Sequence, residues 1–456
     1  HLSLPEKKSC DALGAANKKI LRKQLDLQEF SRAVQPGGSL LQLVKESEML
    51  YAGKFCGGDI VQAQAELLSK QATASFDWRL FQLGYRFGAC LILTFWLLWD
   101  SIVDTLYRPP RNSNWLHSMF PIYRAYFCLV LMLWLAGCMS FVWNKYRINY
   151  IYIFELDPRK VPTLEQIFAL AANATILVMT NFLLYYKVLR GDFPHWLPAP
   201  YLPMILVLTS IGWILANFSS SKGIAMVCWE VVSLLWLGGE VNFLTAFVAD
   251  VFTSMAKLWV DLAYTFCVLF TGSWLHDSDE LTQTRCAKNK FFVSVIKVLV
   301  TVLPLYFRFV QNVKLYRKFV RPFPFLANAM KYVVSMAVSL FSTLHAASEV
   351  KKDPESYTAF YILFTCIATI YSYVWDITMD WGLARKSHGG LRERLMFGNR
   401  WIYYAVILVD LIGRFMWVIT LMPRNDNPIP LFPDLVTPFL AAIELCRRAM
   451  CCDNLA

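Results

Sequence analysis

Residues 400–422 read RWIYYAVILVDLIGRFMWVITLM, which is long and apolar enough to cross the hydrocarbon core of a bilayer as one helix. Asp410 and Arg414 lie inside this stretch, four residues apart and therefore on one face of the expected helix. An ionised side chain in the hydrocarbon costs roughly 3 kcal/mol or more, so such residues turn toward a polar interior rather than toward lipid. The stretch predicts a membrane-spanning helix that lines a polar path.

The same combination recurs through most of the chain after residue 79. Apolar stretches of spanning length run near residues 79–105, 119–143, 163–187, 198–218, 242–272, 289–312, 325–347, 355–379, 400–422 and 435–452. Further charged residues lie inside these stretches or at their ends: Asp250, Arg308, Lys331, Asp376, Asp380, Arg447 and Arg448. We therefore predict an all-α, polytopic membrane protein with about ten transmembrane helices.

The segment 222–239 decides the topology, because it could either span the membrane or lie along its interface. If it does not span, both termini and the basic loops near 145–160, 314–321 and 385–400 fall on one side, which the positive-inside rule makes cytosolic. We predict three parts: a cytosolic N-terminal segment (1–78), N-terminal transmembrane helices (79–218) and a transmembrane core (219–456) that contains the polar path.

The composition argues against a soluble protein. Hydrophobic residues make up 57% of the chain and charged residues only 17%, against about 25% charged in soluble domains. The net charge of +11 is explained largely by cytosolic loops, so we predict membrane lipid and no nucleic acid as partners. The six histidines are scattered, and we find no catalytic or zinc-binding motif. We therefore predict that the chain is not an enzyme and binds no metal or cofactor.

Two cysteines flank a loop, residues 271–290, that this topology places outside the cytosol. Cys267 lies just before the loop and Cys286 lies near its end. Both are within reach of an oxidising compartment, where a disulfide can form and persist. Two alternatives stay open at this point: a Cys267–Cys286 disulfide, or two free thiols.

The charged residues group on helix faces, because positions three or four apart are neighbours on a helix. Arginine suits a tetrahedral oxyanion, since its planar fork donates two parallel hydrogen bonds and stays protonated when buried. Acids beside the arginines would orient and partly neutralise them, so that an anion binds weakly enough to leave. The pattern favours an anion path; the alternatives are salt bridges that only hold the helices together, or a cation or proton site at Asp376 and Asp380. The residues that share faces are Asp250 with Ser254, Arg308 with Gln311, Asp376 with Asp380, Asp410 with Arg414, and Glu444 with Arg447 or Arg448.

A series of short motifs extends this pattern from about residue 150 to residue 450. They are FELDPR at 154–159, RFVQ at 308–311, KY at 331–332, WDITMDWGL at 375–383, RF at 414–415 and ELCRR at 444–448. In these motifs the chain resembles the EXS family, which includes the PHO-type phosphate exporters and proteins like the xenotropic and polytropic retrovirus receptor. The resemblance implies a phosphate exporter whose last six helices enclose a channel-like path for inorganic phosphate.

The resemblance also implies roles for individual residues. Trp417, one turn after Arg414, would act as a gate toward the outer mouth of the path. Two copies of the chain would pair through their first helices as a homodimer. The residues that would contact phosphate or line its path are Asp250, Ser254, Arg308, Gln311, Lys331, Tyr332, Asp376, Asp380, Arg414, Arg447 and Arg448.

The chain departs from most exporters of that family in its N-terminal segment. Those proteins carry an SPX domain, for which residues 1–78 are too short. Either that domain was removed upstream of His1, or the chain is an EXS-only member, which favours the Golgi membrane over the plasma membrane. For a Golgi protein, an alternative function is the retention of glycosyltransferases, whose tails would bind the basic loops at 314–321 and 385–400.

Overall fold

The computed structural model describes residues 40–64, 78–107, 113–158, 161–192, 198–233, 241–275, 282–350, 355–383, 390–391, 399–421 and 432–455. The chain divides into two units, His1–Arg79 and Leu80–Ala456. The first unit contains α3 (Leu40–Phe55), and most of the predicted cytosolic segment 1–78 lies outside the described residues. The regular elements within the described ranges are all helices, which confirms the predicted all-α class.

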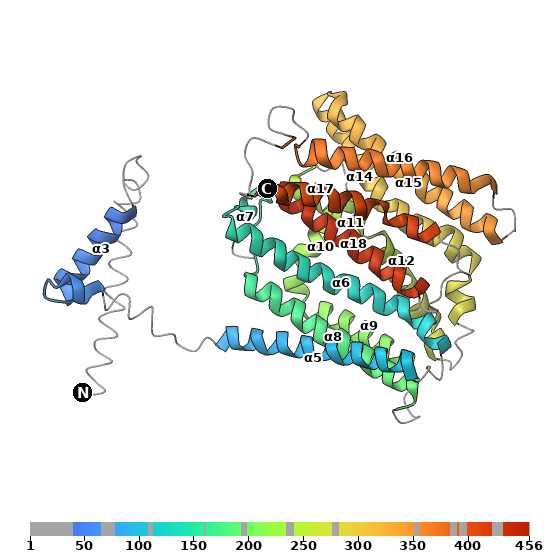
Figure 1. Cartoon of the computed structure of the whole chain (residues 1–456), viewed down its shortest axis with the longest axis horizontal. Helices are drawn as coiled ribbons and strands as arrows, with labels where there is room; N and C mark the ends of the chain where they lie inside the picture. Colours follow the sequence, from blue (N-terminus) through green and yellow to red (C-terminus); the bar gives the residue numbers. More distant parts are fainter. Residues whose placement is uncertain are drawn as a thin grey trace. The chain divides into compact units, whose positions relative to one another are not determined.

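The N-terminal helices of the second unit run alongside one another (Figure 1). α8 begins at a capping box formed by Thr163 and Gln166 and ends at Gly191, whose φ of 80° favours glycine. A buried apolar cluster that includes Tyr123, Tyr185 and Met204 packs these helices together. The helices are α5 (Trp78–Tyr107), α6 (Ser113–Lys145), the short α7 (Tyr150–Ile153), α8 (Leu164–Arg190) and α9 (Tyr201–Ala216).

The C-terminal helices pack around α14 and α18. α14 contacts α11, α12 and α15, while α18 contacts α6, α11, α12 and α17. Because α18 touches both groups of helices, it lies where they meet (Figure 1). The elements are α10 (Phe218–Ser233), α11 (Phe243–Ser254), α12 (Ala256–Thr271), α14 (Lys297–Phe319), α15 (Pro322–Val350), α16 (Glu355–Trp375), α17 (Arg400–Phe415) and α18 (Phe432–Leu455).

The described residues contain seven helices that are long and apolar enough to span a membrane, or eight if one bent pair counts as a span. A spanning helix needs about 20 residues. α9 is apolar but only 16 residues long, and α10, which holds most of the ambiguous segment 222–239, is equally short. The polytopic class is confirmed, and the count of about ten helices stays a prediction.

The predicted span 242–272 is not one straight helix. It consists of α11 and α12, which meet at an angle of 74°. The break lies at Met255, directly after Ser254, and the carbonyl of Phe252 at the end of α11 accepts hydrogen bonds from the Met255 N–H at 3.2 Å and from Trp259 Nε1 at 3.0 Å. Helices broken at membrane depth line polar cavities, because free backbone groups are not tolerated against lipid. The break therefore marks the surroundings of Ser254 as a polar interior.

Candidate functional site

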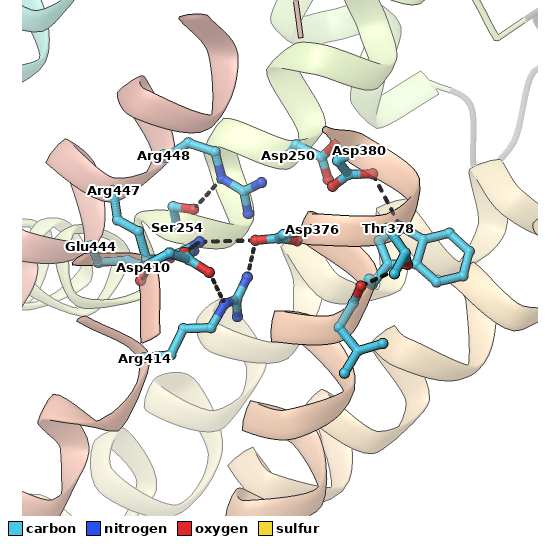
Figure 2. A network of polar contacts seen from close by, with 12 residues as sticks. Asp250, Ser254, Asp376, Thr378, Asp380, Asp410, Arg414, Glu444, Arg447 and Arg448 are labelled. Atoms are coloured by element: carbon cyan, nitrogen blue, oxygen red, sulfur yellow. Dashed lines mark hydrogen bonds and ion pairs between the residues drawn. The ribbon is translucent and has the colours of Figure 1, made fainter. Parts of the chain in front are cut away.

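Charged side chains gather in the interior of the C-terminal helices, and Figure 2 shows part of this group. They come from α11, α14, α15, α17, α18 and the π-helical turn Asp376–Asp380 that follows α16. Arg308, Asp376 and Arg447 are all buried. Because a lone buried charge is costly, the pairing of these residues decides what the site can do.

Arg308 of α14 is the centre of the first group of contacts. Its Nη2 donates to Oδ2 of Asp250 at 3.0 Å, and its Nη1 donates to Oε1 of Gln311 at 2.7 Å. The hydroxyl of Tyr332, on α15, donates to the other carboxylate oxygen of Asp250 at 2.8 Å. Gln311 in turn donates to the backbone carbonyl of Thr245 at 3.3 Å. These contacts tie α11, α14 and α15 together, and each of the three guanidinium nitrogens donates to an acceptor.

Lys331 of α15 is buried in a different way. Its Nζ lies 5.1 Å from the ring centroid of Tyr332 and 5.4 Å from that of Trp375. Such cation–π contacts are worth about 2 kcal/mol when the cation is desolvated. Three acids act on Lys331 electrostatically, but in the part of the chain that the structure describes none lies within the 4.0 Å of an ion pair. The ammonium group therefore keeps N–H donors that an anion can use.

Asp376 and Asp380 lie on a π-helical turn rather than on the ordinary helix that the sequence predicts. The backbone N–H of Trp381 closes this turn by donating to the carbonyl of Asp376 at 2.8 Å. Turns of this kind are frequent at functional sites. Here the two carboxylates have different partners: Asp380 accepts a hydrogen bond from Trp375 Nε1 at 3.1 Å, whereas Asp376 reaches toward α17 and α18 (Figure 2).

Asp376 is shared by two arginines. Arg414 Nη2 and Arg447 Nη1 both donate to its Oδ2, the latter at 3.1 Å. Asp410 is shared in the same way, accepting from Arg414 Nε at 3.3 Å and from Arg447 Nη1 at 3.0 Å. Glu444 holds the other edge of Arg447 with contacts of 2.6 and 3.0 Å. We call these five residues the shared network.

Arg448 adds a contact between α18 and the broken helix. Its Nε donates to the hydroxyl of Ser254 at 2.9 Å, and Ser254 is the last residue of α11. Figure 2 shows the guanidinium of Arg448 extending from Ser254 toward the space beside Asp376. The break in the helix thus places the hydroxyl of Ser254 against this arginine.

Acids and bases are equal in number across the site, so the fully ionised interior has no net charge. An incoming anion must therefore take the place of an acid or use a base that has no acid against it. The bases are Arg308, Lys331, Arg414, Arg447 and Arg448, and the acids are Asp250, Asp376, Asp380, Asp410 and Glu444.

Two members of the shared network, Asp410 and Glu444, were not among the predicted path residues. Their spacing from Arg414 and Arg447, by four and three residues, was the signal that pointed to them. Trp417 lies on the 3₁₀ turn Met416–Leu421 after α17 and is half-buried. Its role as a gate stays a prediction.

A disulfide joins Cys267 of α12 to Cys286, with the two Cα atoms 6.0 Å apart. It connects the end of α12 to the π-helical turn Gln283–Ala287. Residues 276–281, between the two cysteines, lie outside the described residues. Among the residues that the structure describes, no group of three or more His, Cys, Asp or Glu side chains is placed to hold a metal ion.

These observations define a polytopic, all-α membrane protein with a charged interior. The EXS family model matches residues 119–452, which is well over half of the chain, and the chain therefore belongs to the EXS family.

Comparison with curated proteins gives relatives over most of the chain. It is 29% identical over 452 residues to "SPX and EXS domain-containing protein 1" of Dictyostelium discoideum, covering 97% of this chain and 47% of that protein. It is 25% identical to human "Solute carrier family 53 member 1" and 26% identical to the "Xenotropic and polytropic retrovirus receptor 1 homolog" of Xenopus laevis, in both cases covering 89% of this chain and 59% of the relative. The chain spans about half the length of these relatives.

Proposed function

We propose that the chain carries inorganic phosphate across a membrane through a path lined by the predicted residues of the C-terminal helices. The observation that carries this proposal is the sharing of Asp376 by Arg414 and Arg447 inside a membrane protein. Membership of the EXS family and a relative named as a solute carrier support transport rather than catalysis. A carboxylate shared between two cations also gives each arginine an acceptor that an anion can replace while the other arginine keeps the acid paired.

Phosphate would enter the shared network in place of the Asp376 carboxylate. Carboxylate and phosphate oxygens accept the same charge-assisted hydrogen bonds from a guanidinium, worth about 1.5–3 kcal/mol each. Arg414 or Arg447 can therefore exchange one acceptor for the other at a small net cost while the second arginine keeps Asp376 paired. The same exchange in reverse releases phosphate, because Asp376 stays on its helix and competes for both arginines.

Lys331 would supply the charge that first attracts the anion. Its ammonium group is held against two aromatic rings, and no acid of the described chain lies within ion-pair distance. Arg308 is less suited to this step, because Asp250 and Gln311 already occupy its donors. We therefore assign Lys331 to capture and the shared network to transfer.

The acids of the path would favour phosphate over sulfate. Near neutral pH phosphate keeps at least one proton, whereas sulfate has none. Asp380 accepts one hydrogen bond from Trp375, and a carboxylate has room to accept another from protonated phosphate. Sulfate at the same position would meet repulsion between two anions without a compensating hydrogen bond.

The compartment and the partners follow the sequence predictions. We propose a homodimer in either of two compartments, the Golgi membrane or the plasma membrane. The alternative function, retention of glycosyltransferases, depends on the basic loops 314–321 and 385–400, and most of the second loop lies outside the described residues. Transport is favoured because the charged interior has no part in binding cytosolic tails.

The test is the uptake of labelled phosphate by proteoliposomes that contain the purified chain. The double variant Arg414→Gln/Asp410→Asn removes one base and one acid that bond to each other, so that the interior stays neutral. We expect saturable flux in the wild type and at least about a tenfold loss in the double variant, since one or more charge-assisted bonds disappear.

A matched control removes an ion pair of the same kind outside the path. Lys187 of α8 lies 2.8 Å from Asp100 of α5, and Lys187→Gln/Asp100→Asn should leave flux unchanged. Normal flux in folded Arg414→Gln/Asp410→Asn would contradict the proposed path. An equal loss in both double variants would also contradict it, because flux would then follow the general stability of the helices.

A further inference from the structure

A cavity with several polar side chains in its wall lies outside the shared network, between α6, α12 and the segment that follows the disulfide. Its volume is about 340 Å³, and the residues that line it include Ser118, Arg124, Asp261, Tyr264 and Lys297. Polar and ionisable side chains are costly inside a membrane protein unless something polar meets them. The cavity therefore needs a polar occupant.

Arg124 lines this cavity, and its ion pair with Asp261 uses only some of its hydrogen-bond donors. Its Nε donates to Oδ2 of Asp261 at 2.6 Å, and its Nη2 donates to the other carboxylate oxygen. A guanidinium has five N–H donors, and this pairing through Nε and Nη2 does not use the two donors of Nη1. Within the described part of the chain, no acceptor is placed against Nη1. Asp261 thus fixes one edge of the fork and leaves the other edge for a ligand.

Ser118 provides an independent sign of a missing partner. Its side chain is only 4% exposed, and in the described residues its hydroxyl has no hydrogen-bond partner. Its backbone carbonyl accepts a hydrogen bond from the hydroxyl of Tyr264 at 2.8 Å, which holds the residue at the cavity wall. Leaving a buried hydroxyl unsatisfied costs about 1–3 kcal/mol, which a bound acceptor would recover.

The charges around the cavity favour an anion. Asp261 interacts electrostatically with three bases, which are Arg124, Lys257 and Lys297. One acid therefore faces several positive charges, in contrast to the balanced interior at the shared network. Lys297 is exposed and forms no ion pair within the described chain, so its ammonium group is accessible to a ligand.

We propose that this cavity is a second oxyanion site, which takes a phosphate-type tetrahedral anion. Arg124 Nη1 and the Lys297 ammonium group supply charge, and the Ser118 hydroxyl supplies a further hydrogen bond. The shared chemistry fits both a free phosphate ion and the headgroup of a phospholipid. The site does not depend on the proposed transport path, because none of the path residues lines the cavity.

Binding of labelled inorganic phosphate to the full chain in phosphatidylcholine nanodiscs tests this site. Arg414→Gln/Asp410→Asn serves as the background, so that binding at the shared network is removed. Adding Lys297→Gln/Ser118→Ala removes two ligands of the cavity and leaves the Arg124–Asp261 pair intact. We expect this change to weaken the remaining phosphate binding at least about 30-fold, as the loss of a charged and a neutral hydrogen bond predicts.

The matched control is Lys290→Gln in the same background, because Lys290 is an exposed lysine that does not line the cavity. It should bind phosphate as the background does. Equal phosphate binding by the cavity variant and the control would overturn the proposal. Failure of the proposed path would look different, because wild type and background would then bind phosphate equally while the cavity variant still lost affinity.

A second set of nanodiscs, with phosphatidic acid added to phosphatidylcholine, distinguishes the two sources of the anion. If phosphate binding is unchanged by phosphatidic acid, the site takes the free ion. If phosphatidic acid blocks phosphate, and native mass spectrometry shows it retained by the background but not by Lys297→Gln/Ser118→Ala, the site takes a lipid headgroup. Binding of neither phosphate nor phosphatidic acid by the background would overturn the proposal.

Discussion

Lys187 of α8 and Asp100 of α5 form a simple pair, 2.8 Å apart, whereas Asp376 in the C-terminal helices accepts hydrogen bonds from both Arg414 and Arg447. The side chains of the simple pair are 21% and 12% exposed, but those of Arg447 and Asp376 are 3% and 2% exposed. In the N-terminal helices Asp100 thus has one basic partner near the surface, and that base, Lys187, also lies 3.7 Å from the exposed Asp192. The C-terminal helices share one acid between two bases in the interior.

A partly exposed ion pair and a buried, shared carboxylate have different consequences for the binding of an anion. A partly exposed pair is worth about 0–1 kcal/mol, and among the described residues Asp100 has no second base to which it could turn. In the shared network Asp376 and Asp410 each have two cationic partners, so one contact can open while the other holds. An anion can therefore enter without leaving a buried charge alone, which would cost about 3–5 kcal/mol. The first group stabilises helix packing, and the second suits movement of an anion.

The largest effect is expected from the removal of Arg447, because this residue contacts all three acids of the shared network, Asp376, Asp410 and Glu444. We expect Arg447→Gln to abolish phosphate flux and to lower the free energy of unfolding by about 3–5 kcal/mol, because buried acids lose their common partner. Flux in proteoliposomes and thermal unfolding in detergent measure the two effects. Normal flux in Arg447→Gln would show that the shared network is only structural.

Lys331 differs from both the simple pair and the shared network, because it is a buried base without an ion pair among the described residues. We expect Lys331→Gln to raise the phosphate concentration for half-maximal flux about tenfold, while the melting temperature stays the same or rises. The reason is that Lys331 makes no ion pair among the described residues, so the replacement breaks none. Lys331→Arg keeps the charge and serves as the control. A lower melting temperature with unchanged half-saturation would assign Lys331 to structure instead.

Much of this site could be predicted from the sequence, because ionisable residues stand out inside long apolar stretches. The spacing of Asp410 and Arg414 even indicated one of the contacts. Spacing says nothing about register between helices, however. The contact of Arg447 with Asp376 joins residues 71 positions apart and depends on how α18 packs against the end of α16.

The two irregular elements could not be predicted for a related reason. Apolar residues continue through the break after Ser254 and through the π-helical turn at Asp376, so hydropathy indicates an uninterrupted helix at both places. The contacts that compensate for these irregularities come from elsewhere in the fold. Arg448 reaches Ser254 from 194 residues away, and Trp259 donates to the carbonyl of Phe252 at the end of α11.

A smaller effect is expected at Asp380, which stands beside the shared network but outside it. Asp380→Asn should make sulfate about three- to tenfold more effective as an inhibitor of phosphate flux, since a repulsive charge and one neutral-strength hydrogen bond to protonated phosphate are lost. Competition between labelled phosphate and sulfate measures the change. Trp375→Phe, which removes the donor to Asp380 but keeps the carboxylate, should retain the preference for phosphate. Unchanged competition in Asp380→Asn would exclude this acid from anion selection.

The smallest effect is expected at the simple pair, and a double-mutant cycle makes it comparable with the shared network. For Lys187→Gln and Asp100→Asn the coupling in the free energy of unfolding should be at most about 1 kcal/mol, and the coupling in flux should be zero. The same cycle with Arg447→Gln and Glu444→Gln should give a larger coupling in both quantities, because Glu444 holds one edge of Arg447 and so aims the other edge at Asp376. If the two cycles gave equal couplings in flux, sharing of charge would have no special part in transport.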